Sequence, residues 1–456
     1  MKIRFYTLIT ALMLLGITLK AQNEDPEKAM NQYGKEVEET IDLQVQARDG
    51  IITFESKDKN YKFWMDNRMY FDGGIFFDKD AYNPIGNGLT VRRARIAVKA
   101  NLYRNWYGEV DLDFANSVVE LKDVYVKYTN DAENFNIKAG HFKEGFSMET
   151  TTTSRYLTFM ERSLISKFAP SRHLGIQTNY ISDKILLTGG VHFNTIGESE
   201  EVVFSQDANK DFGKDEGFSL TGRVVYRPLI GENKFIHIGT AASYRTPKTT
   251  AEVPDSYRFS TRSISAINRK KYLDTDNIVN VKSNVLWNVE LAAANKNLMF
   301  QAEYIADYIK RDNDSDPNVS LNGFYAQAGI LLNGAKYNYN RNEGEFTQIS
   351  RREGKGALEF DVRFDYIDLN DEEAELFGGG ANAYTLGLNY HFNSNVKFML
   401  NYSYLNHDRY ANGKGKLYVG HDVDGNLTKD YTKVVESDGE AGDDFGQLQM
   451  RIEIDF

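Results

Sequence analysis

Residues 91–114, VRRARIAVKANLYRNWYGEVDLDF, decide the fold, because charged and apolar side chains alternate along them. Arg93, Arg95 and Lys99 share one parity, whereas Ile96 and Val98 share the other. Successive side chains of a β-strand point to opposite faces. The stretch therefore predicts a strand with one basic and one apolar face, and it argues against an amphipathic helix or a nucleic-acid patch.

The following segment, 106–115, reverses the sign of the polar face. Its polar parity is acidic and comprises Glu109, Asp111 and Asp113, and a tight turn at 104–105 separates it from the basic segment. A charge on the lipid face of a membrane barrel costs about 2–4 kcal/mol near mid-membrane. If these strands cross a membrane, both charged faces point inward, and a basic strand lies beside an acidic one.

Alternating segments of about ten residues recur to the end of the chain. Long and short connections alternate between them, with two exceptions, 334–355 and 116–118. An even strand count with short turns at one end and long loops at the other is typical of a transmembrane β-barrel. The long connections include 143–173, 246–281, 369–381 and 408–444. The sixteen segments are 62–72, 89–103, 106–115, 119–129, 135–142, 174–182, 185–194, 217–227, 234–245, 282–293, 297–309, 323–333, 356–368, 382–392, 396–407 and 445–456.

The predicted fold is all-β: a transmembrane antiparallel β-barrel of sixteen strands, wide enough to leave an aqueous lumen. The alternative is a large soluble β-sandwich or propeller, because parity alone does not separate a dry core from a lipid-facing surface. A predicted signal peptide, the asymmetry of the loops and an aromatic content of 13% favour the barrel, since Tyr and Phe form strands and membrane-interface girdles.

The N-terminus predicts export. Lys2 and Arg4 form a basic start, 5–19 is apolar, and Ala21 offers a small residue for cleavage, so we expect residues 1–21 to be a signal peptide. The alternative is an uncleaved anchor, although the apolar run is shorter than the ~20 residues that span a bilayer. Residues 22–50 are expected to form a charged leader and 51–456 the barrel, in the cell outer membrane of a Gram-negative bacterium.

Composition excludes several classes of protein. The net charge is −11, and three of the 54 basic residues lie in the predicted signal peptide, so its removal would leave −14. Nucleic acid is therefore not an expected partner. The absence of cysteine rules out disulfides and thiolate metal sites. No HExxH, GxSxG or Walker pattern occurs, so we expect no enzyme, no cofactor and no metal.

An acidic loop at 311–318 is the nearest approach to a cation site. Asp312, Asp314, Asp316 and Asn318 occupy alternate positions, as in a calcium loop. The glycine and the distal glutamate of an EF-hand are absent. A solvated acidic loop is the simpler interpretation.

The connection 143–173, KEGFSMETTTTSRYLTFMERSLISKFAPSRH, is too long and apolar to lie free in water. It also carries Lys143, Arg155 and Arg162. A loop folded into the lumen would bury its apolar groups and narrow a channel. We expect such a constriction, and the alternative is a cap outside the barrel.

VRRARIAVKANLYRNW, AGHFKEGF, TSRYLTFMERSL, FAPSRHLG and the C-terminal strands ending in LQMRIEIDF together resemble the phosphate-selective porins O and P. The resemblance implies a sixteen-stranded trimeric anion channel whose arginines lead to a lysine cluster at the constriction. Arg68, Arg92 and Arg93 fall on the family's arginine positions. Tyr107 and Thr150 stand where phosphate-specific members have lysine, so two anchors of the family's phosphate site are missing.

We therefore predict an outer-membrane porin for passive diffusion of small hydrophilic solutes, with an anion preference and with phosphate or polyphosphate as the family-implied solute. The inward charges either stiffen the wall as ion pairs or form a basic ladder that attracts anions. The expected partners are outer-membrane lipid, small anionic or neutral solutes and two further copies in a homotrimer. The alternative is a surface-exposed barrel for adhesion or membrane structure. The candidate pore-lining and anion-binding residues are Arg68, Arg92, Arg93, Arg95, Lys99, Lys143, Arg155 and Arg162.

Overall fold

The structure is a computed structural model that describes residues 29–37, 41–48, 50–77, 81–198, 217–247, 255–312 and 316–456. The predicted signal peptide, 1–21, lies outside the described residues. No helix in these ranges is both long and apolar enough to cross a bilayer.

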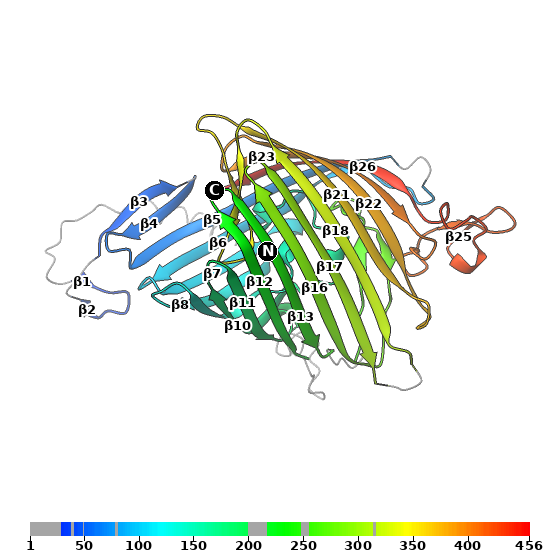
Figure 1. The fold of residues 1–456 in the computed structure, drawn as a ribbon, viewed down its shortest axis with the longest axis horizontal. Helices are drawn as coiled ribbons and strands as arrows, with labels where there is room; N and C mark the ends of the chain where they lie inside the picture. Colours follow the sequence, from blue (N-terminus) through cyan, green and yellow to red (C-terminus); the bar gives the residue numbers. More distant parts are fainter. Residues whose placement is uncertain are drawn as a thin grey trace, which may run out of the picture.

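Sixteen antiparallel strands close into a barrel, in which β26 pairs with β5 (Figure 1). Each overlaps one predicted segment, which confirms the predicted fold class. The strands are β5 (Tyr61–Phe77), β6 (Gly88–Leu102), β7 (Trp106–Asp113), β8 (Glu120–Thr129), β9 (Phe135–Lys143), β10 (Arg172–Ile181), β11 (Ile185–His192), β12 (Ser219–Gly231), β13 (Lys234–Arg245), β16 (Val281–Asn295), β17 (Leu298–Arg311), β18 (Val319–Leu331), β21 (Ala357–Asp371), β22 (Leu376–His391), β23 (Val396–His407) and β26 (Phe445–Asp455).

The two ends of the barrel differ in their connections. Tight turns such as 103–105 and 182–184 lie at one end, here called the turn end, and most long connections lie at the other, the loop end. The prediction of a long loop at 369–381 is wrong, because β21 and β22 continue past a register shift and only 372–375 joins them. The polar, glycine-rich composition of this stretch suggested a loop, although its backbone remains paired as strand.

A hairpin precedes the barrel at the turn end. β3 (Leu43–Arg48) pairs with β4 (Ile51–Ser56), and β4 pairs with the start of β5 through Thr53 and Trp64. Figure 1 shows it as an extension near the C-terminus. Part of the expected leader, 22–50, therefore forms strand, since LQVQAR alternates as a strand does. β1 (Ala29–Met30) and β2 (Glu36–Val37) form a separate two-stranded ladder.

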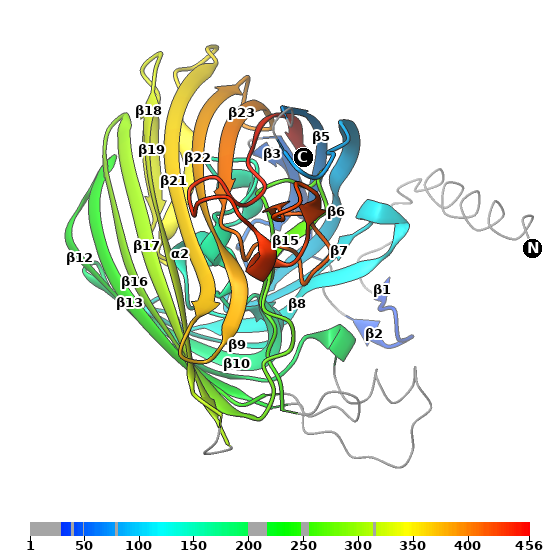
Figure 2. The same cartoon turned by 90° about the vertical axis from the view of Figure 1, so that its right-hand side faces the viewer.

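The connection between β9 and β10 folds into the barrel, as predicted. It contains α2 (Met148–Thr151), η2 (Ser154–Tyr156) and η3 (Leu164–Lys167), and Figure 2 shows α2 within the wall of strands. We call residues 144–171 the constriction loop. Seven of its apolar side chains are at most 2% exposed, because they are packed inside the barrel; they are Phe146, Met148, Phe159, Met160, Leu164, Ile165 and Phe168.

Two further connections carry strands of their own, the one between β13 and β16 and the one between β23 and β26. β14 (Ser260–Arg262) and β15 (Lys271–Asp274) pair between β13 and β16, and Tyr272 and Leu273 are fully buried in the core at the loop end. The remaining short elements lie in other connections: η1 (Ala115–Ser117), η4 (Ile196–Glu198), β24 (Gly420–His421), β25 (Leu427–Thr428) and η5 (Tyr431–Lys433).

The long connection at the turn end forms an inner hairpin that sequence reasoning did not foresee. β19 (Lys336–Asn340) and β20 (Glu345–Ser350) join β18 to β21. Tyr337 and Phe346 are 4% and 6% exposed and pack in one cluster with Phe235 of the wall and Met148 of the constriction loop. The hairpin therefore narrows the lumen from the turn end, as the constriction loop does from the loop end.

Candidate functional site

Strand β6 supplies the basic face on which the site is built. Arg93 and Arg95 are 7% and 6% exposed, whereas Ile96 and Val98 on the other parity are each 41% exposed. The alternation in RARIAVK, residues 93–99, thus turns the cations into the lumen and the aliphatic groups toward lipid. Lys99 lies on the inner side with them, and its ammonium contacts Asp66.

Arg92 reaches the lumen by a different route. The register between β5 and β6 shifts after Tyr70, which leaves Arg92 without a pairing partner between Arg93 and Val91. Such a bulge re-aims one side chain. The guanidinium of Arg92 donates to both carboxylate oxygens of Glu161 in the constriction loop, at 2.5 and 2.9 Å. Strict alternation from Arg93 would give this residue the parity of Ile96 and Val98, and the bulge brings it inside.

Several candidate cations are bound by carboxylates of the wall. Asp66 accepts from Lys99 at 2.7 Å and also contacts Arg155 and, at 3.6 Å, Arg68. Arg95 donates to Asp113 at 2.8 Å. These pairs connect neighbouring strands and fix the constriction loop, so their charges are largely used within the wall.

Three candidate cations have no such partner. Within the described ranges, no carboxylate oxygen lies within ion-pair distance of Arg93, Lys143 or Arg162. Arg93 lies over the ring of Tyr70, 5.7 Å from its centroid. Lys143 donates only to the carbonyls of residues 151 and 152, at 3.2 and 3.1 Å. Arg162 donates to the carbonyls of residues 149, 150 and 152. Their positive charge is therefore available to an anion.

Two further cations of this kind were missed by sequence reasoning. Lys127 and Lys138 face each other across β8 and β9, and Lys127 also pairs in register with Tyr107. The Lys127 ammonium lies 5.1 Å from the ring centroid of Tyr107, and the Lys138 ammonium lies 4.4 Å from that of Phe142. Their signal was the alternation of DVYVKY and NIKAGHF, which places both lysines on the inner parity. We call Arg93, Lys127, Lys138, Lys143 and Arg162 the unpaired cations.

The unpaired cations line one cavity of about 380 Å³, which we call the basic cavity. The inner wall of β5 to β10, the constriction loop and the tip of the β19–β20 hairpin enclose it. Arg68, Arg95, Lys99 and Arg172 also line it, as do the carboxylates of Glu109, Asp123, Glu343 and Glu345. Cations outnumber carboxylates in this lining.

A second cavity of about 390 Å³, which we call the outer cavity, lies nearer the loop end. Arg162 lines both cavities and therefore connects them. Arg92 lines only this outer cavity, which holds one carboxylate, Glu161. Although burial favours its neutral form, Arg92 and Arg451 hold the pKa of Glu161 below its usual range. The other cations of this cavity are Lys167, Arg262, Arg269 and Lys271.

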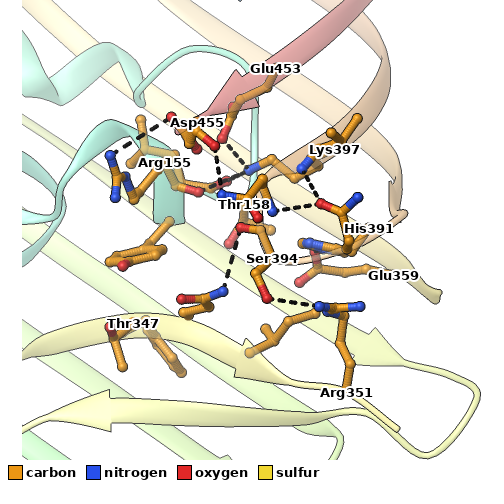
Figure 3. A pocket seen from close by; sticks show the side chains of 18 of the residues that line it. Arg155, Thr158, Thr347, Arg351, Glu359, His391, Ser394, Lys397, Glu453 and Asp455 are labelled. Carbon is orange, nitrogen blue, oxygen red and sulfur yellow. Dashed lines mark hydrogen bonds and ion pairs between the residues drawn. The ribbon is translucent and has the colours of Figure 1, made fainter. Parts of the chain in front are cut away.

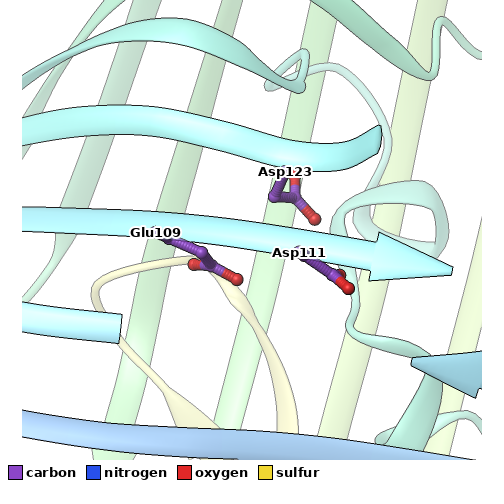
Figure 4. Close-up of side chains that lie close together, drawn as sticks. All are labelled: Glu109, Asp111 and Asp123. Atoms are coloured by element: carbon purple, nitrogen blue, oxygen red, sulfur yellow. The ribbon is translucent and has the colours of Figure 1, made fainter. Parts of the chain in front are cut away.

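Three carboxylates stand close together beside the basic cavity (Figure 4). One oxygen from each of Glu109, Asp111 and Asp123 lies within 4.8 Å of the others. Lys99 contacts Glu109 at 3.4 Å and Arg95 contacts Asp111 at 3.7 Å, while Asp123 accepts from Arg172. The trio therefore serves as counter-charge to the basic strand.

A third cavity, of about 220 Å³, lies at the turn end on the other side of the inner hairpin (Figure 3). Arg155 lines this cavity and not the basic one. Its permanent charges balance in number, since Arg155, Arg351 and Lys397 stand with Glu359, Glu453 and Asp455. Lys397 contacts Glu453 at 3.3 Å, and His391 contacts Glu359 at 2.9 Å. Nothing in this lining favours one sign of solute charge.

Backbone contacts hold the constriction loop rigidly against the acidic side of the wall. The backbone N–H of Glu149 donates to Glu303 at 2.7 Å, and that of Leu164 donates to Asp365 at 3.0 Å. Asn288 in turn donates to the carbonyl of Phe146 at 3.0 Å. The loop thus packs against carboxylates of β17 and β21, whereas the basic cavity lies along β5 to β10.

The acidic loop at 311–318 is paired with its surroundings. Asp312 contacts Lys282 at 3.2 Å, and Asp316 accepts from Asn280 at 2.9 Å. Asp314 lies outside the described residues. The described part of this loop therefore forms surface contacts with neighbouring strands.

A family model described as phosphate-selective porin O and P matches residues 65–427. Porin O of Pseudomonas aeruginosa is 25% identical over 400 residues, which cover 80% of this chain and 88% of that protein. An uncharacterized protein of Caulobacter vibrioides is 26% identical over 364 residues, covering 78% of this chain and 71% of that protein.

Two solved structures are similar in fold. The anion-selective porin from Comamonas acidovorans has a TM-score of 0.50 at 11% identity, covering 87% of this chain and 100% of that one. The trimer form of OmpT, an outer membrane protein of Vibrio cholerae, has a TM-score of 0.51 at 11% identity, covering 87% and 99%. At this identity the likeness concerns the barrel architecture alone.

Proposed function

The chain belongs to the phosphate-selective porin O and P family, and we propose that its channel prefers small anions, which pass along the unpaired cations. The protein is an outer-membrane porin, which forms a water-filled channel for the passive diffusion of small hydrophilic solutes. In such barrels the short turns face the periplasm and the long loops face the exterior. An anion from outside would meet the outer cavity, then Arg162, then the basic cavity.

The placement of the unpaired cations carries this proposal. Five buried or half-buried cations without a carboxylate partner in the described residues line a single cavity between the constriction loop and the wall of β5 to β10. A ring of cationic side chains selects for anions because it replaces part of their hydration and lowers their electrostatic barrier. The paired cations Arg68, Arg95 and Lys99 would add a weaker field.

We propose phosphate as a solute, although lysine is absent at two family positions. Tyr107 stands at one of them, and Lys127 lies directly over its ring from the adjacent strand. Lys138 lies opposite Lys127. Lys127 on the adjacent strand and Lys138 on the strand after it thus supply two lysines close to the position that lacks one. At Thr150, the other position, Lys143 and Arg162 lie nearby, since both donate to carbonyls of residues 150–152.

We also propose that the channel is a homotrimer, as family membership implies, and that it has no catalytic activity. The family consists of channels, and many inner-wall carboxylates are engaged by cations or by backbone N–H groups. Native mass determination tests the trimer: a trimeric species should survive in mild detergent and dissociate on boiling, whereas a monomer under both conditions would contradict it.

Blocking of the chloride current by phosphate tests the solute. Purified protein in a planar bilayer should conduct chloride, and added phosphate should reduce that current because it binds the same cations more tightly. Sulfate serves as the control for charge alone. If phosphate and sulfate leave the chloride current equally unchanged, the proposed phosphate site is wrong, whereas a chloride preference would still support an anion channel.

A further inference from the structure

The tip of the β19–β20 hairpin is held in the lumen by two buried arginines of the opposite wall. Arg223 donates to the carbonyls of Glu343 and Gly344 at 3.2 and 3.1 Å, and Arg227 donates to that of Arg341 at 2.7 Å. Both guanidinium groups are nearly inaccessible, with 2% and 0% exposure. The tip is thus fixed between the two sides of the lumen.

Glu345 follows this tip directly and lines the basic cavity. It is 6% exposed, and within the described residues its carboxyl group makes no hydrogen bond and no ion pair. Lys143 and Arg162 line the same cavity. A buried carboxylate that lacks hydrogen-bond partners is costly, so its neutral form is favoured.

We propose that Glu345 is a selectivity residue of the anion pathway: as a neutral carboxyl it donates a hydrogen bond to a passing oxyanion, and as a carboxylate it repels that anion. The inference rests on the proposed function and deepens it, because it names a group that decides when the pathway admits anions.

Burial, reinforced by the neighbouring Glu343, raises the pKa of Glu345 to about 8, although Lys143, Arg223 and Arg162 act in the opposite direction. At neutral pH the group is therefore mostly protonated. It then offers an O–H donor beside cations that already attract the anion. Above its pKa it adds a negative charge inside a narrow, partly desolvated cavity, where one charge acts strongly.

The charged and titratable groups on the elements that pack against β20, and Arg223 beside the hairpin tip, are largely fixed by other partners. Arg223 of β12 pairs with Glu290 at 2.7 Å, and Glu149 of α2 accepts from Ser163. Arg155 of η2 pairs with Asp66. Tyr337 of β19 donates to Glu359 at 2.8 Å, and the Tyr339 hydroxyl contacts His237 at 2.7 Å. The groups left to respond to Glu345 are Glu343, Lys143 and Arg162.

The test compares E345Q with the matched variant E353Q, whose residue is exposed in the same connection and lines none of the three cavities. Chloride-to-potassium permeability is measured in planar bilayers about two pH units below and about two units above the pKa of Glu345. In the unmodified protein and in E353Q, the ratio should fall about fivefold as pH rises. In E345Q it should stay near its low-pH value, because glutamine cannot ionise. E345A should behave like E345Q and guards against a local effect of the amide.

Two outcomes would overturn the inference and can be told apart. If E345Q loses anion preference with pH as steeply as the unmodified protein, lysines of the cavity titrate and Glu345 has no such role, while the anion channel stands. If none of the proteins prefers anions at either pH, the proposed function itself fails and this inference with it.

Discussion

At the scale of single residues, the cations of the inner wall fall into two groups that sequence parity cannot separate. Arg95 and Arg93 occupy the same face of β6 two positions apart. Arg95 donates to Asp113 at 2.8 Å, whereas Arg93 has only the ring of Tyr70 beside it. The first stabilises the barrel and the second is available to solute. We therefore propose that the ion-pair interpretation applies to Arg95 and the anion-attracting interpretation to Arg93.

Exchanging the two arginines separately tests this division. R93Q should lower the chloride-to-potassium permeability ratio by a factor of about 3–10, because an unpaired charge leaves the pathway. R95Q should change the ratio less but should destabilise the barrel by about 3–5 kcal/mol, because it leaves Asp111 and Asp113 buried without their cation. Reversal potentials and urea unfolding measure the two effects. Equal loss of selectivity in both variants would contradict the division.

A second prediction concerns Lys127 on β8 and Lys138 on β9. K127Q combined with K138Q should weaken the block of chloride current by phosphate about tenfold or more, since each charge-assisted contact contributes about 1.5–3 kcal/mol. K122Q is the control, because Lys122 contacts the exposed Glu120 instead of the basic cavity. Titration of the chloride current with phosphate provides the measurement. An unchanged half-blocking concentration in the double variant would refute the lysine site.

Parity predicted the orientation of most wall residues but not their partners. Arg92 shows the limit most clearly: its inward position depends on a bulge opposite Tyr70, and no residue in VRRAR signals that bulge. Lys127 and Lys138 lay on predictable faces, yet only the register of β7, β8 and β9 shows that they meet beside Tyr107.

At the scale of elements, two inward-folded segments shape the lumen, and only one was predictable. The constriction loop was predictable because its sequence is long and apolar. The β19–β20 hairpin was not predictable, because KYNYN and EFTQIS are typical of an ordinary polar connection. Its apolar residues, Tyr337 and Phe346, find their partners on β13 and in the constriction loop, which are distant in sequence.

Glu161 fastens the constriction loop to β6 and β26 through Arg92 and Arg451. The pKa of Glu161 in the folded protein is held below its usual range, so these ion pairs contribute stability above the usual glutamate pKa, and that contribution is lost as pH falls through the lowered value.

We therefore expect steady single-channel currents at neutral pH and increased current noise only in strong acid, well below the usual glutamate pKa of about 4.3. E161Q should show the noise already at neutral pH, because a neutral amide pairs weakly with either arginine. E120Q, which removes an exposed carboxylate, should remain quiet. Steady currents in E161Q at every pH would mean that the loop is held without this contact.

Removing the inner hairpin tests its share of the constriction. A short Gly-Ser turn in place of 336–350 should raise single-channel conductance about twofold or more, because the narrowest section widens. Shortening the outer hairpin, 420–428, is the matched control, since β24 and β25 lie at the other end of the molecule (Figure 1). No change in conductance after removal of 336–350 would show that the constriction loop alone sets the pore.

At the scale of the whole molecule, the sixteen strands were predictable because period-two alternation, turn chemistry and the asymmetry of connections all agree. The error at 369–381 left the strand count intact, since it concerned only where β21 and β22 end. The net charge of −11 was a poor guide to the pore, because charge is distributed unevenly: the constriction loop packs on carboxylates of β17 and β21, whereas cations outnumber carboxylates along the basic cavity. We therefore expect selectivity to depend on which carboxylates the loop covers, a property of the assembled barrel.

The reversal potential of the purified channel under an about tenfold potassium chloride gradient tests the central claim most directly. An outer-membrane porin whose basic cavity is lined by the unpaired cations should show a potential of the sign that chloride permeation produces. R93Q should move that potential toward zero. A stable potential of the opposite sign, which potassium permeation produces, would contradict the account.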